Sequence, residues 1–170
     1  MPKVDDAVLP LPELEGAAID VRYETDLLDT AGHPAHAATW IRQRVIVLDK
    51  TLRTAGREKA RVMVHELFHF VWVRLGNLRR REWEGLLRSE WDAKAKGETG
   101  WSAEWRKREL EQKDLDKRSP YWREYCCESF CDTAALIYAG AGDENSLAGK
   151  WERGRRKWFA CNIENRKVAL

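Results

Sequence analysis

The chain has 170 residues and nearly balanced charge, with 30 lysines and arginines against 28 acids and a formal net charge of +2. This length suits one domain with a sizeable core, so we expect a single domain over residues 1–170. The balanced charge argues against a dedicated nucleic-acid-binding protein. No apolar run approaches the roughly 18 residues of a membrane span, and the acidic N-terminus lacks a secretory signal. We therefore expect a cytoplasmic protein without membrane contact.

Short strands are expected in the first 50 residues. Residues 1–15 contain acids and prolines and are expected to form an arm. Residues 18–24 alternate apolar and polar side chains, which predicts a strand with one solvated face. Residues 37–41 and 44–48 predict two more strands, joined by a turn at residues 42–43. Together these segments indicate a small antiparallel sheet.

A helix expected to begin at Thr54 or Gly56 carries the motif HELFH from His65 to His69. Residues four apart lie on one face of a helix, so both imidazoles can bind one zinc ion. Glu66 lies beside such a metal and can take a proton from bound water. The flanking residues are apolar, and burying these three polar groups without partners is costly. The alternative is two core histidines bonded to backbone, with the glutamate paired to an arginine.

Residues 78–118 form a segment dominated by charge, with tryptophans interleaved. Two helices are expected in it, over about 79–95 and 102–117. We expect a Trp-rich helical insertion whose tryptophans pack on one another and on the core, since a buried tryptophan supplies a large apolar area. The alternative is a lid or wall of a substrate groove, with Trp and Arg as anchors. The tryptophans concerned are Trp83, Trp91, Trp101 and Trp105.

Residues 119–140 predict a second buried helix, because a serine suits its N-cap, a proline its first position and a glycine its end. Glu124, Glu128 and Asp132 fall on one face of it at four-residue steps. A catalytic zinc takes three protein ligands and keeps one open position. We assign Glu128 as the third ligand, with Glu124 as the alternative. Asp132 would accept the free N–H of a ligating histidine. The competing interpretation is a solvated acidic stripe facing lysine or arginine.

Hydrolysis of a peptide bond also needs a donor for the developing oxyanion. Tyr125 is a candidate on the same helix, as are Tyr121 and Arg123, and no spacing argument selects one of them. Cys127 and Cys131 are interpreted as small buried thiols, because the chain has no C-x-x-C pair of the kind that builds structural zinc sites.

Residues 143–170 form a C-terminal basic helix and tail, with the helix expected over 146–159. Trp151 and Trp158 are seven apart and so share one helix face. We therefore expect the tryptophans to pack inward, the basic side chains to be solvated and nucleic acid not to be a partner.

These motifs resemble the ImmA/IrrE family of metallo-endopeptidases. The resemblance covers about residues 40–139 and is carried by the aliphatic run at 45–49, the HELFH helix, and Glu128 followed eight and nine positions on by Leu136 and Ile137. The spacing from Glu128 to Asp132 also resembles thermolysin-like zinc peptidases. Two departures are Ser129-Phe130 after the glutamate and the lack of a proline after the aliphatic pair.

The resemblance implies an α+β fold, with a small antiparallel sheet packed on a mainly helical zincin-like core, and Zn²⁺ as cofactor. It implies hydrolysis of a peptide bond in a protein substrate, often a transcriptional repressor. In this interpretation His65, His69 and Glu128 bind zinc, and Glu66 is the general base of a metalloprotease. The alternative is a catalytically silent zinc-binding module for regulation or interaction, against which the intact Glu66 argues.

Overall fold

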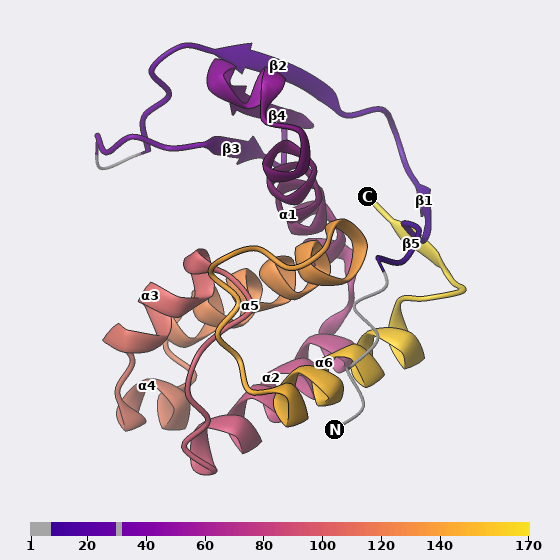
Figure 1. The fold of residues 1–170 in the computed structure, drawn as a ribbon. Helices are drawn as coiled ribbons and strands as arrows, with labels where there is room; N and C mark the ends of the chain where they lie inside the picture. The colour runs from indigo at the N-terminus through magenta and orange to yellow at the C-terminus, as the bar shows by residue number, and fades with distance from the viewer. Residues whose placement is uncertain (1–7, 30–31) are drawn as a thin grey trace.

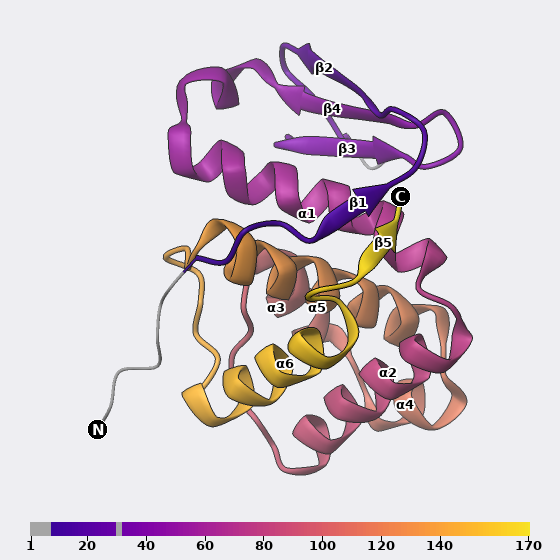
Figure 2. The same ribbon diagram turned by 90° about the vertical axis from the view of Figure 1, so that its right-hand side faces the viewer.

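Helix α1 (Gly56–Arg74) lies between a small sheet and a group of helices, as Figures 1 and 2 show. The computed structural model describes residues 8–29 and 32–170. Phe70 of α1 is fully buried on the sheet side, with Ile46, Leu48 and Leu52. Phe68 is fully buried on the opposite side, where its ring lies 5.8 Å from that of Phe130. α1 thus buries apolar side chains against both layers. The combination of these helices with small sheets makes the fold α+β, the class expected from the sequence.

The main sheet has three strands in the order β2-β4-β3. The strands are β2 (Asp20–Glu24), β3 (Ala37–Trp40) and β4 (Val45–Asp49). β3 pairs with β4 in antiparallel fashion, as expected for a hairpin, but β2 runs parallel to β4. The prediction of an antiparallel sheet is therefore wrong for β2. Apolar–polar alternation predicts a strand but carries no direction, and the chain between β2 and β4 is long enough to return to the starting end.

A second, two-stranded sheet joins segments near the two ends of the chain. β1 (Glu13–Glu15) pairs in parallel with β5 (Lys167–Ala169), beside α1 in Figure 2. The expected N-terminal arm therefore contains a strand, and its residues 1–7 lie outside the described part of the chain. A short 3-10 helix, η1 (Lys50–Thr54), leads from β4 into α1.

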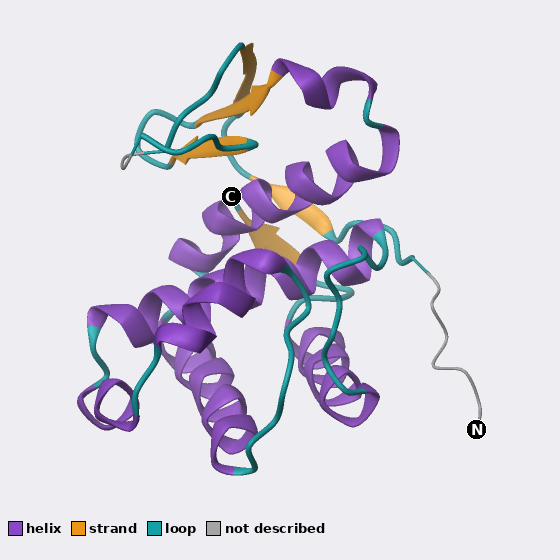
Figure 3. Ribbon diagram, turned by 60° about the vertical axis from the view of Figure 1, so that its left-hand side comes forward, coloured by secondary structure: helices purple, strands orange, loops and turns teal. Residues whose placement is uncertain are grey.

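The other helices gather on the side of α1 away from the main sheet (Figure 3). They are α2 (Asn77–Asp92), α3 (Trp101–Glu109), α4 (Gln112–Lys117), α5 (Pro120–Ala139) and α6 (Gly149–Asn162). The start of α5 follows the sequence prediction, since Ser119 Oγ accepts the Trp122 N–H and Pro120 occupies the first position. In the described ranges no helix combines the length and apolarity needed to cross a membrane.

The helix expected over 102–117 is in fact two helices. Leu110 and Glu111 adopt extended backbone conformations between α3 and α4. The Glu111 side chain accepts from the N–H of Asp114, whose own side chain accepts the Glu111 N–H at 3.0 Å. This reciprocal capping box begins a new helix at Gln112 and explains the break.

The tryptophans of the 78–118 segment divide into two groups. Trp83 is fully buried and Trp91 packs partly against the same core. Trp101 and Trp105 of α3 are 60% and 42% exposed, so the expectation that all four pack inward is wrong for these two. α3 therefore presents aromatic surface to solvent.

A buried ion network fixes the segment between α2 and α3. Arg155 of α6 donates to both carboxylate oxygens of Glu90 and of Glu98, at 2.6–3.0 Å. Lys107 lies 3.1 Å from Glu98, and the Tyr125 hydroxyl donates to the same carboxylate at 2.6 Å. Arg155 and Glu98 are fully buried, so the expectation of solvated basic residues on α6 is wrong for Arg155. The network connects α2, α3, α5 and α6.

Candidate metal centre

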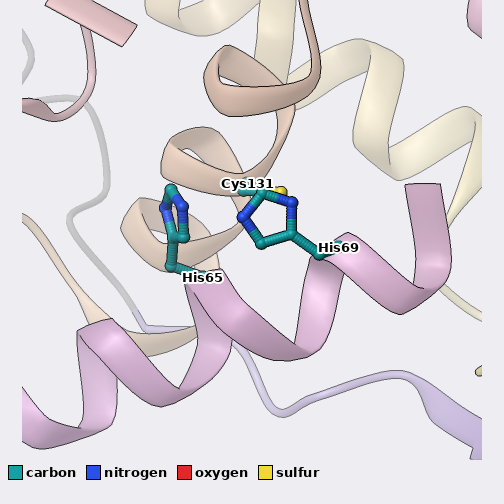
Figure 4. Close-up of side chains that lie close together, drawn as sticks. All are labelled: His65, His69 and Cys131. Carbon is teal, nitrogen blue, oxygen red and sulfur yellow. The ribbon is translucent and has the colours of Figure 1, made fainter. Parts of the chain in front are cut away.

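His65 and His69 lie one turn apart on α1 and face α5, with ring centroids 5.0 Å apart (Figure 4). Both are largely buried, with side chains 11% and 20% exposed. Their position follows from the packing of α1, since the apolar residues around them hold the helix between the sheet and α5. The two imidazoles thus line the α1–α5 interface, where a polar group needs a partner.

Glu128 of α5 reaches both imidazoles. Its Oε2 atom lies 3.2 Å from His65 Nε2, and its Oε1 atom lies 3.9 Å from His69 Nε2. Nitrogen and oxygen ligands at 2.0–2.1 Å from a tetrahedral zinc lie roughly 3.3 Å from one another. Glu128 therefore brings a different carboxylate oxygen to each imidazole, and the donor set of two imidazoles and one carboxylate is of the kind that binds a catalytic zinc.

The other ring nitrogens of the two histidines have partners of their own. His65 Nδ1 lies 2.8 Å from Asp132 Oδ1, and His69 Nδ1 lies 3.4 Å from Cys127 Sγ. Such contacts fix the tautomer and orientation of a ligating imidazole and leave Nε2 for a metal. Asp132 Oδ2 also accepts the Ala103 N–H at 2.9 Å, so one carboxylate orients His65 and the first turn of α3.

The charges around the pair favour a cation. Burial opposes protonation of His65, but Asp132 and Glu128 outweigh it and raise the pKa of His65 well above its usual range. Burial also opposes protonation of His69, but the neighbouring Cys127 and Glu128 outweigh it and raise the pKa of His69 to about 9. Burial would raise the pKa of Glu128, yet the two imidazoles and Arg106 lower it to about 2. Protons therefore compete with a metal for Nε2, and metal affinity falls as the pH falls.

The remaining predicted site residues lie elsewhere. Glu124 is exposed, one turn before Glu128, and the carboxylate that approaches both imidazoles is that of Glu128. The Tyr125 hydroxyl hydrogen is donated to Glu98 in the buried ion network, so we do not retain Tyr125 as an oxyanion donor. Tyr121 and Arg123 are exposed on α5.

Cys131 joins the histidines as a possible metal donor. Its sulfur and one nitrogen of each imidazole all lie within 4.8 Å of one another, as Figure 4 shows for the side chains. Burial raises the pKa of Cys131 well above its usual value, as does its hydrogen bond to Cys127. A metal that binds a thiol displaces its proton, so Cys131 is a second candidate for the third ligand beside Glu128.

Glu66 lies on the side of α1 nearer the sheet. Thr39 Oγ1 of β3 donates to Glu66 Oε2 at 2.6 Å. A pocket of about 150 Å³ opens beside this pair and is lined by Thr39, Ile41, Glu66, His69, Val73 and Cys127. The carboxylate and one imidazole thus line the same pocket.

Sequence reasoning missed two residues at this centre. Thr39 lies 27 positions before its partner, and nothing in an edge strand distinguishes it from other threonines. Arg106 of α3 places Nη2 3.7 Å from Glu128 Oε1, and it is one of many arginines in a charge-rich segment. Comparison of the chain with protein-family models, with curated proteins and with solved structures finds no match.

Proposed function

We propose that this chain is a zinc-dependent metallo-endopeptidase that hydrolyses a peptide bond in a protein substrate. The observation that carries the proposal is the approach of Glu128 to the Nε2 atoms of His65 and His69 beside a pocket that contains Glu66. Zinc bound by these three residues would polarise a carbonyl and activate water. Glu66, held by Thr39, would accept the proton of that water and return it to the leaving amine.

The likeness of the HELFH helix and the Glu128 helix to ImmA/IrrE peptidases supports the same proposal and gives a transcriptional regulator or repressor as the substrate class. We also propose that the protein is located in the cytoplasm. All four cysteines are free thiols, as is usual in a reducing compartment.

Metal analysis of a Glu128→Ala variant tests the site. We expect about one zinc per chain in the unaltered protein and a much lower content in the variant, because the substitution removes one of the three proposed ligands. Glu124→Ala, one turn earlier and exposed, is the matched control and should retain zinc. If Glu128→Ala keeps its zinc and Glu124→Ala loses it, the third ligand is Glu124 and not Glu128. Absence of metal from the unaltered protein, even after zinc is added back, would refute the proposal.

The silent zinc-binding module remains the alternative because of Cys131. A fourth protein ligand from this residue would close the coordination shell, as in structural zinc sites. In the same metal analysis, Cys131→Ser should keep its zinc if the site is catalytic and lose much of it if the site is closed. Loss would favour the silent module over the peptidase.

A further inference from the structure

Arg106 is a cation at the candidate metal centre with donors that the protein does not use. Its Nη1 atom donates to Ser102 O at 2.9 Å. Its Nε atom is buried and, among the described residues, has no hydrogen-bond partner. Its Nη2 atom lies 3.7 Å from Glu128 Oε1, beyond hydrogen-bond range. Because Nε is shielded from solvent, the donor that a substrate oxygen can reach is Nη2, which lies near Glu128 without a hydrogen bond to it.

The position of Arg106 is well defined. The guanidinium lies over the Trp105 ring, 4.3 Å from its centroid, and its side chain is 23% exposed, against 63% for Arg108 two residues on. α3 is itself fixed to the centre, because the Ala103 N–H donates to the carboxylate that contacts His65. Lys107 ties the same helix to the buried ion network. A guanidinium held in this way loses little entropy when it binds an anion.

Arg106 also fills a role that the proposed mechanism leaves open. Among residues 8–29 and 32–170 it is the one lysine or arginine that forms an ion pair with Glu128. Of the three donors considered from the sequence, the Tyr125 hydroxyl donates to Glu98, and Tyr121 and Arg123 are exposed on α5. A guanidinium stays charged at every working pH, so it can stabilise negative charge without gaining or losing a proton.

We propose that Arg106 is a catalytic residue of the proposed peptidase, on which this inference rests. It donates from its guanidinium to the oxygen of the scissile carbonyl and to the oxyanion that forms there. No bond to Arg106 is made or broken, and its charge is constant. A preorganised donor of this kind acts mainly on the transition state, so its loss should lower kcat more than it raises KM.

The first test compares zinc-loaded unaltered protein with Arg106→Ala, Arg106→Lys and Arg108→Ala on a mixture of quenched fluorescent peptides. Arg106→Ala should lower kcat by about 10²–10³-fold with its zinc content and circular dichroism unchanged. Arg106→Lys should retain an intermediate rate, and added guanidinium ion should restore part of the kcat of Arg106→Ala. Arg108→Ala, an exposed position on the same helix, should be unaffected. An unchanged kcat in Arg106→Ala would overturn the role of Arg106 and leave the peptidase standing.

A second test does not depend on turnover. Inorganic phosphate is a tetrahedral oxyanion, and its binding to cobalt-loaded protein can be followed by the visible spectrum of the metal. We expect the unaltered protein and Arg108→Ala to bind phosphate at least about tenfold more tightly than Arg106→Ala, the worth of one charge-assisted hydrogen bond. Equal affinities would refute an anion-binding Arg106. If the phosphate affinities differ as expected but the unaltered protein cleaves no peptide, the result would refute the proposed peptidase instead.

Discussion

Replacing Glu66 with Gln is expected to lower kcat by about 10²–10⁴-fold while zinc binding stays intact, because a general base contributes that much and an amide cannot accept the proton. Glutamine has the same shape and keeps an oxygen that can accept from Thr39 Oγ1. The proposed ligands His65, His69 and Glu128 do not change. The measurement is single-turnover cleavage of a fluorescent peptide, together with the zinc content of the same sample.

The matched control for this experiment is Glu58→Gln. Glu58 is an exposed carboxylate in the first turn of the same helix, so its replacement repeats the chemical change away from the pocket. The control should cleave at the rate of the unaltered protein. Cleavage by Glu66→Gln at that same rate, with one zinc per chain, would show that another group activates the water.

Replacing Arg155 with Met is expected to lower the free energy of unfolding by about 3–5 kcal/mol, because it leaves Glu90 buried without its cation and Glu98 with Lys107 alone. The two carboxylates are 1% and 0% exposed, and each accepts two hydrogen bonds from the guanidinium. Urea unfolding followed by tryptophan fluorescence measures the loss. Arg153→Met, an exposed position on the same helix, should change stability by less than about 0.5 kcal/mol.

The deficit of Arg155→Met should depend on pH. Burial favours a raised pKa for Glu98, but Arg155 and Lys107 outweigh it and lower the pKa to about 2, from 4.5. A lowered pKa contributes stability that is present above pH 4.5 and is lost as the pH falls toward 2. The difference between the variant and the unaltered protein should therefore be largest near neutral pH and shrink over that acid range. A deficit that stays constant down to pH 2 would contradict the assigned role of the pair.

Local signals explain what could be predicted from the sequence. Ser119, Pro120 and Gly140 act within a turn of the helix ends that they define, so α5 begins and ends where expected. The four-residue spacing of His65 and His69 places both on one helix face whatever the rest of the fold. Glu128 and Asp132 follow the same rule on α5, so their shared face was readable from the sequence.

Tertiary packing decides what could not be predicted. The direction of β2 depends on the route of the chain between β2 and β4, and no local pattern records that route. Arg155 reads as one more solvated cation until Glu90 and Glu98, 65 and 57 positions away, are brought to it. Arg106 and Thr39 come to the centre from a helix and a strand that contain no recognisable motif.

The position of α1 between two layers has a consequence for how this chain can change by mutation. The groups proposed to hold zinc lie on α1 and α5, whereas the hydroxyl that holds the proposed base comes from β3. A substitution in the sheet can thus lower the proposed turnover and leave metal affinity intact, whereas loss of Glu128 on α5 would lower both. Descendants of this sequence could lose hydrolysis through Thr39 alone and survive as metal-dependent binding proteins, with the HELFH motif unaltered.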